Sequence, residues 1–92
     1  FGKVVFQLKQ TTPKPLMLMM GNNLKTIRTE RGLSQSKLAK LSHVERTLIG
    51  KIEKGERSLS LQNICKLAIA LDITPNELFE GYETILNKLP IK

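Results

Sequence analysis

Cysteine and histidine are scarce in this 92-residue chain, which has one residue of each. A single cysteine, Cys65, excludes an intramolecular disulfide and a cysteine-based metal site, and it is typical of a reducing cytoplasm. The single histidine, His43, has no second catalytic group at a suitable spacing, and the chain has no glycine-rich phosphate loop. We therefore expect no enzymatic activity, no bound metal and no cofactor.

Long apolar runs are also absent. No stretch approaches the ~20 apolar residues that a membrane-spanning helix needs, and no secretory pattern opens the chain. We expect a cytoplasmic protein without a membrane segment. Its 92 residues are enough for one domain with a small core.

Positive charge is concentrated in the middle of the chain, although the net charge of the whole is +7. Residues 22–60 hold nine Lys or Arg against four Glu, whereas residues 61–92 hold three Lys against four acids. A basic region of this kind favours a polyanionic partner such as DNA. The alternative is a surface whose lysines serve only solubility.

Two short amphipathic helices are predicted within residues 34–53, separated only by Ser42-His43-Val44. Helices joined so tightly must cross steeply, which is the helix-turn-helix arrangement. His43 lies where the turn needs a left-handed residue, and histidine is one of the few non-glycine residues enriched there. Apolar residues three and four positions apart mark the buried sides, namely Leu38, Ala39 and Leu41 in the first helix and Val44, Leu48, Ile49 and Ile52 in the second.

A family resemblance is carried by Leu33-Ser34-Gln35, Leu38-Ala39, Val44, Arg46-Thr47, Ile49 and Ile52-Glu53-Lys54-Gly55. With these residues in register, the chain resembles the phage-repressor-like (XRE) helix-turn-helix family over residues 24–79. The resemblance implies an all-α fold that binds DNA. Glu45-Arg46-Thr47 is similar to the controller proteins of restriction–modification systems. The sequence departs from the family pattern at His43, where glycine is usual, and at Leu59, where proline is common.

We expect residues 21–92 to form an all-α domain of five or six helices that ends in a dimerisation helix. Asn22 or Asn23 is predicted to cap the first helix, and Gly32 to end it. Ser34 is predicted to cap the second helix and Ser60 the fourth.

The C-terminal third has two further helical signals. Residues 61–71 are apolar nearly all round, which predicts a helix central to the core with Cys65 as a packing residue. Thr74-Pro75-Asn76-Glu77 combines an N-cap, a proline at the first helical position and the glutamate of a capping box.

Residues 1–20 do not follow the helical pattern. Residues 4–8 are a short β-type run, and the prolines at 13 and 15 predict a break in any helix there. The native start could be Met17, Met19 or Met20. We expect residues 1–20 to be a disordered arm, a leader or a segment added for expression, or else a short strand that pairs across a dimer or enters a groove.

The third helix is the predicted recognition helix. Its outward side carries residue types that hydrogen-bond to base edges in the major groove, and the resemblance assigns base contacts to Arg46, Thr47 and Lys51. Glu45 is included with them, although its side chain could instead complement the positive end of the helix. The predicted phosphate contacts are Lys25, Ser34, Gln35, Lys54 and Arg57.

The resemblance also implies that Arg28 and Glu53 form a structural ion pair between the first and third helices. At the C-terminus, apolar residues at helical spacing indicate a self-complementary dimer face or a helix that packs back on the core. The face would comprise Phe79, Tyr82, Ile85, Leu86 and Leu89.

Together these features predict a transcriptional regulator that binds double-stranded DNA as a homodimer at a palindromic operator. The polymerase or a toxin could be a further protein partner. The alternative is an antitoxin-like or adaptor domain that uses the fold mainly to bind protein.

Overall fold

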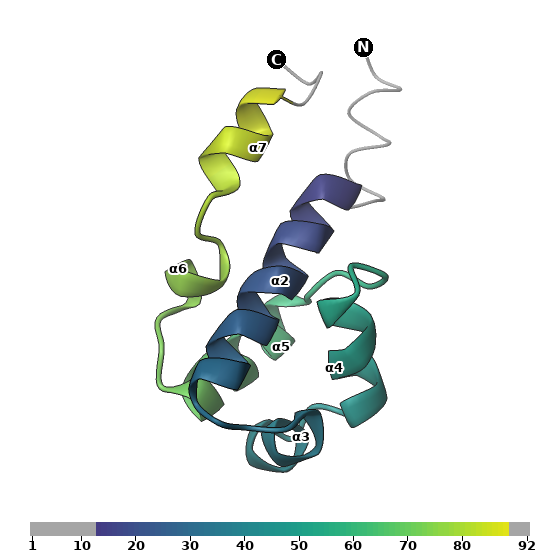
Figure 1. Cartoon of the computed structure of the whole chain (residues 1–92), viewed down its shortest axis with the longest axis vertical. Helices are drawn as coiled ribbons and strands as arrows, with labels where there is room; N and C mark the ends of the chain where they lie inside the picture. Colours follow the sequence, from purple (N-terminus) through teal and green to yellow (C-terminus); the bar gives the residue numbers. More distant parts are fainter. Residues whose placement is uncertain (1–12, 89–92) are drawn as a thin grey trace.

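The computed structural model describes residues 13–88, and these residues form six helices and no strand (Figure 1). The prediction of an all-α fold is confirmed, and the expected β-type run at residues 4–8 lies outside the described residues. The helices are α2 (Lys14–Glu30), α3 (Gln35–Ser42), α4 (Arg46–Glu53), α5 (Leu61–Leu71), α6 (Pro75–Leu78) and α7 (Tyr82–Lys88).

The first described helix, α2, begins at Lys14, so the prediction of a start at Asn22 or Asn23 is wrong. Pro13 is the N-cap, and Pro15 lies in the first turn, where the missing N–H has no intrahelical partner to lose. The two prolines therefore begin the helix instead of preventing it. The helix runs without a break through residues 20 and 21, where we expected the arm to end.

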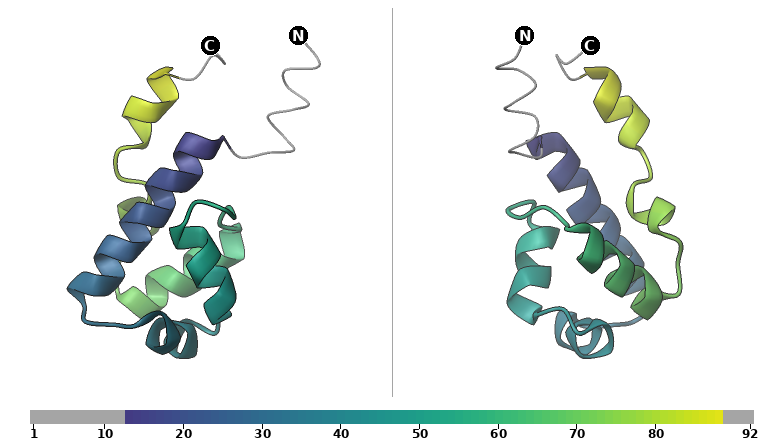
Figure 2. Two further views of the ribbon diagram at one scale, coloured as in Figure 1. Left: turned by 45° about the vertical axis from the view of Figure 1, so that its right-hand side comes forward. Right: turned by 180° about the vertical axis from the view of Figure 1, so that it is seen from behind.

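Asn23 has a long-range role in place of a cap. Its side-chain amide donates to the carbonyl oxygens of Leu78 (2.9 Å) and Glu80 (3.0 Å). These bonds join the middle of α2 to the segment between α6 and α7. Figure 2 shows α7 beside the N-terminal part of α2.

The helix-turn-helix forms as predicted. Ser34 caps α3, its hydroxyl oxygen accepting from the Lys37 amide at 3.0 Å. α3 ends at His43, which adopts the left-handed conformation with φ 60° and ψ 30°. The buried Ser42 hydroxyl oxygen accepts from the Val44 amide at 3.3 Å. These local bonds shape the short turn that leads into α4.

Among the described helices, α2 to α6 contribute apolar side chains to the core. Its buried members are Met20, Leu24, Leu38, Val44, Ile49, Ile52, Ile64, Leu67, Leu71 and Leu78. Gly21 lies where α2 crosses α4, and a Cβ atom placed there would be 2.1 Å from the carbonyl oxygen of Ile52. Only glycine lets the two backbones approach so closely.

The prediction that α5 is buried on all sides is wrong, and so is the packing role expected for Cys65. Leu61 is 78% exposed, Ile69 is 81% exposed, and Cys65 is exposed. Only one side of the helix, which includes Leu67 and Leu71, enters the core. Leu41 of α3, expected on a buried stripe, is also 48% exposed.

The capping box before α6 forms as predicted, with the Thr74 amide donating to the Glu77 carboxylate at 3.0 Å. Within residues 13–88, no helix combines the length and the apolar character needed to cross a membrane.

Candidate nucleic-acid interface

The outward side of α4 carries the predicted base-contacting residues. Arg46, Thr47 and Lys51 are all exposed, whereas Ile49 and Ile52 are buried. At about 100° per residue, positions 46, 47 and 51 fall within an arc of roughly 140° around the helix axis. Three hydrogen-bonding side chains therefore share one side of a helix whose opposite side is fixed in the core.

Glu45 precedes this helix as its N-cap and is exposed. Its carboxylate accepts no hydrogen bond from the backbone amides of the first turn of α4. It stands at the end of the helix that also carries Arg46 and Thr47.

A nearly buried ion pair fixes the other end of α4. The Arg28 guanidinium donates to the Glu53 carboxylate through Nε at 2.6 Å and Nη2 at 3.0 Å, and through Nη1 to the carbonyl of Leu33 at 2.7 Å. The two side chains are 10% and 4% exposed. The hydrogen bond to Glu53 raises the pKa of Arg28 above its ordinary value, with burial opposing and the charge of Glu53 adding to the rise. This pair joins α2, the loop before α3 and the end of α4.

Gln35, a predicted phosphate contact, belongs to the same network. Its amide nitrogen donates to Glu53 Oε1 at 3.0 Å, and the side chain is half-buried. A Cβ atom at Gly50 would lie 3.6 Å from Gln35 Oε1, so the glutamine side chain sits against the middle of α4. The first turn of α3 is thereby held beside α4.

Lys54 and Arg57 lie at and after the end of α4, and both are exposed. The loop between them begins at Gly55, which has a left-handed φ of 74°. The amides of Gly55 and Glu56 donate to the carbonyl oxygens of Ile52 (3.0 Å) and Lys51 (2.9 Å) in the last turn of α4. Two exposed basic side chains therefore lie beyond the end of the helix that carries Arg46, Thr47 and Lys51.

The other two predicted phosphate contacts differ in placement. Ser34 lies at the start of α3 and its hydroxyl oxygen is already engaged as the helix cap. Lys25 is exposed on α2, a separate element from the helix-turn-helix.

Sequence reasoning missed Lys14 because residues 1–20 were expected to be an arm. Its Nζ donates to the carbonyl oxygen of Gly55 at 2.5 Å, and Leu18 packs directly beneath the same glycine. The first turns of α2 therefore support the loop that carries Arg57. The proline at the first helical turn was the signal that could have indicated this helix.

The predicted C-terminal dimer face is only partly available at the surface. Tyr82 is 45% exposed, Phe79 packs against the core, and Ile85 and Leu86 are half-buried. Leu89 lies outside the described residues.

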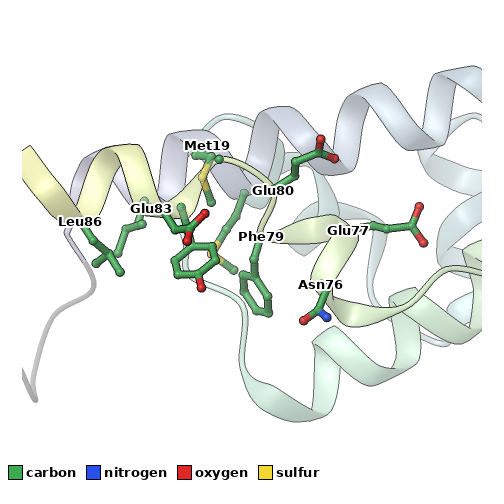
Figure 3. Close-up of a pocket in the computed structure, with 11 residues that line it drawn as sticks. Met19, Asn76, Glu77, Phe79, Glu80, Glu83 and Leu86 are labelled. Carbon is green, nitrogen blue, oxygen red and sulfur yellow. The ribbon is translucent and has the colours of Figure 1, made fainter.

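A hollow of about 740 Å³ lies between the N-terminal part of α2 and the α6–α7 segment, and Met19, Phe79 and Leu86 line it (Figure 3). Glu77, Glu80 and Glu83 also line the hollow. Its apolar part is continuous with the residues expected at the dimer face.

Comparison with known proteins identifies a helix-turn-helix family and several similar proteins. The helix-turn-helix model HTH_3 matches residues 24–78. The control protein C.MunI of Mycoplasma sp is 39% identical over 69 residues, which are 74% of this chain and 93% of that protein.

Solved structures of two controller proteins are similar to this chain. The restriction-modification controller protein C.AhdI from Aeromonas hydrophila is 51% identical with a TM-score of 0.67, over 68% of this chain and 96% of that one. A tetramer of the controller protein C.Esp1396I in complex with its natural 35 base-pair operator gives 29% identity and a TM-score of 0.66, over 79% and 96% of the two chains.

Proposed function

Because this chain belongs to the helix-turn-helix family HTH_3, we propose that it is a sequence-specific DNA-binding transcriptional regulator of the restriction–modification controller type. The observation that carries the proposal is the exposure of Arg46, Thr47 and Lys51 on one side of α4. That side is free of contacts from the core, and both ends of the helix are fixed. The C.Esp1396I tetramer on its operator supports the same function by similarity.

Base reading is assigned to α4 in the major groove. Arg46 and Lys51 donate to guanine O6 and N7, and Thr47 offers a hydroxyl group and a methyl group to thymine. Glu45 accepts from cytosine N4 at the start of the helix. These contacts select the sequence.

Phosphate binding is assigned to groups around α4, where it supplies affinity and salt dependence. Lys54 and Arg57 bind the backbone beyond the end of the helix, and Lys25 adds a contact from α2. Ser34 and Gln35 lie at the start of α3, where backbone amides and the helix dipole attract a phosphate.

The regulator acts as a homodimer that places two copies of α4 in successive major grooves of a palindromic operator. We assign part of the dimer contact to the C-terminal face of Phe79, Tyr82, Ile85, Leu86 and Leu89. The protein works in the cytoplasm on double-stranded DNA and is not an enzyme. The polymerase is a candidate further partner.

Arg46→Ala is expected to weaken binding to the operator by about 1–3 kcal/mol and to relax discrimination at one base pair. The reason is the loss of a paired donor to a base edge. Band-shift titration on duplex DNA from just upstream of the protein's own coding region, and on single-base variants of it, measures both effects. Equal weakening on the operator and on random DNA would show that Arg46 binds phosphate only. No weakening on either would favour a protein-binding adaptor domain.

Lys54→Ala is the matched control for that experiment, since both side chains are exposed cations near α4. A phosphate contact predicts lower affinity for all sequences and a salt slope smaller by about 1. Base preference should stay unchanged in this variant.

A further inference from the structure

The side chain of Gln35 lies on the side of α4 to which we assign base reading, although Gln35 itself belongs to α3. A Cβ atom at Gly50 would be 3.6 Å from Gln35 Oε1 and 3.9 Å from Nε2, so the amide group lies over this glycine. At about 100° per residue, Gly50 falls within the arc of roughly 140° that holds the three proposed base-contacting side chains. A residue of α3 therefore adds its amide to the surface that α4 presents.

The carboxylate of Glu53 fixes the orientation of this amide. Gln35 Nε2 donates to Glu53 Oε1 at 3.0 Å, and the Arg28 guanidinium donates to both oxygens of the same carboxylate. An ionised carboxylate has no hydrogen to donate, so the reverse orientation of the amide would set two oxygen atoms against each other. The carbonyl oxygen Oε1 is thus turned away from Glu53, and it accepts no hydrogen bond from residues 13–88.

We propose that the Gln35 side chain is a specificity-determining contact, whose Oε1 accepts a hydrogen bond from the exocyclic amine of an operator base. This inference rests on the proposed function and adds a base contact from outside α4. The backbone amides at the start of α3 keep the phosphate role proposed above.

The bases that can supply this hydrogen bond are few. In the major groove the hydrogen-bond donors are adenine N6 and cytosine N4. Adenine also presents N7 as an acceptor beside N6, and Gln35 Nε2 has a second hydrogen besides the one given to Glu53. Adenine can therefore engage both ends of the amide while the bond to Glu53 is kept, whereas cytosine can engage only Oε1. The geometry favours adenine.

The same orientation disfavours a phosphate contact by this side chain. A phosphate oxygen would meet Oε1, which accepts hydrogen bonds and cannot donate them. A phosphate at Nε2 would lie close to the carboxylate of Glu53, which already occupies that nitrogen at 3.0 Å. In this respect Gln35 differs from the exposed cations Lys54 and Arg57.

Gln35→Met tests the proposal, since methionine has a similar length and lacks the amide. Glu53 keeps both of its bonds from Arg28 in this variant. In selection from random-sequence duplex DNA, the wild type should enrich adenine at one position of each half-site beyond those that depend on Arg46. Gln35→Met should reduce that preference about tenfold and keep the preferences at the other positions.

Ser36→Ala is the matched control, because Ser36 is exposed in the same turn of α3 and its side chain makes no contact with Glu53. This variant should keep every base preference of the wild type. Circular dichroism and the thermal midpoint show whether both variants are folded. Unchanged adenine preference in folded Gln35→Met would overturn the proposal.

Removal of the amine from the base separates base reading from a purely structural role. Two operator duplexes are compared, one with adenine at the selected position and one with a purine base that lacks the N6 amine. The analogue should weaken binding of the wild type about tenfold more than binding of Gln35→Met, because only the wild type loses a hydrogen bond. If Gln35 serves only to hold α3 against α4, the analogue weakens both proteins equally, and the proposal fails.

Failure of this inference is distinguishable from failure of the proposed function. If the enriched sequence changes with Arg46→Ala but not with Gln35→Met, the Gln35 inference is wrong and the regulator proposal stands. If the wild type enriches no sequence, both are wrong. Enrichment of cytosine at the position that Gln35→Met alters would support the contact with an exocyclic amine and contradict the two-atom pairing with adenine.

Discussion

Arg28→Ala is expected to lower the free energy of unfolding by about 3–5 kcal/mol, because it leaves a buried carboxylate without its partner. The Glu53 side chain is only 4% exposed, and two of its hydrogen bonds come from the lost guanidinium. The carbonyl of Leu33 loses its donor as well. A domain of 92 residues has a total stability of about 5–14 kcal/mol. Urea denaturation followed by circular dichroism measures the loss, and a change below about 1 kcal/mol would contradict the buried-pair interpretation.

The double variant Arg28→Met with Glu53→Leu separates the cost of an unpaired charge from the value of the pair. Replacement of a buried ion pair by apolar residues is often neutral or stabilising, so the double variant should recover most of the lost stability. It should not recover full operator affinity, because Gln35 loses the carboxylate to which its amide donates. Recovery of both properties would show that the pair does not position Gln35.

Gly21→Ala is expected to destabilise the fold by about 3 kcal/mol, although helix propensity alone predicts a gain of about 1 kcal/mol. The added Cβ would lie 2.1 Å from the Ile52 carbonyl oxygen, and backbone at both sites prevents an easy shift. The two helices would have to separate, which opens the core between α2 and α4. Thermal or urea denaturation shows whether the substitution lowers or raises the free energy of unfolding.

Gly50→Ala is the matched control, since it makes the same change in the interior of another helix. Its Cβ would be 3.6 Å from Gln35 Oε1, an ordinary contact with a flexible side chain. With no steric clash at this position, the higher helix propensity of alanine should stabilise the protein by up to about 1 kcal/mol. Equal effects of the two substitutions would contradict the close helix crossing at Gly21.

The helix-turn-helix could be predicted from sequence because its determinants are local. Ser34 caps a helix three residues from its bonding partner, and the left-handed turn at His43 follows from the short gap between two apolar stripes. The capping box at Thr74 and Glu77 is equally local. The resemblance to a known family supplied the Arg28–Glu53 pair, which spacing alone does not give.

The start of α2 was missed because proline near a helix end can be read in two ways. Prolines prevent a helix when they lie inside it and favour one in its first turn. The contacts that favour a helix at residues 14–18 are distant in sequence, since Lys14 and Leu18 contact Gly55 more than 30 residues away. A helix whose first turns are stabilised by such long-range contacts cannot be recognised from the local sequence pattern alone.

The exposure of α5 was missed because composition does not say which sides of an apolar helix are covered. Residues 61–71 are apolar on nearly all sides, yet the neighbours in the described chain cover only one of them. The uncovered side, with Leu61 and Ile69, is visible only once the packing is known. Similarly, the bond between Gln35 and Glu53 depends on how α3 and α4 are placed.

Selection of binding sites from a pool of random-sequence duplex DNA tests most directly whether the exposed side of α4 reads bases. We predict enrichment of a pseudo-palindromic sequence whose half-sites lie about 10 base pairs apart, as expected for two copies of α4 in successive major grooves. The same selection with Arg46→Ala should lose preference at one position in each half-site. Salt-sensitive binding of the wild type without any enriched sequence would contradict base reading by Arg46, Thr47 and Lys51.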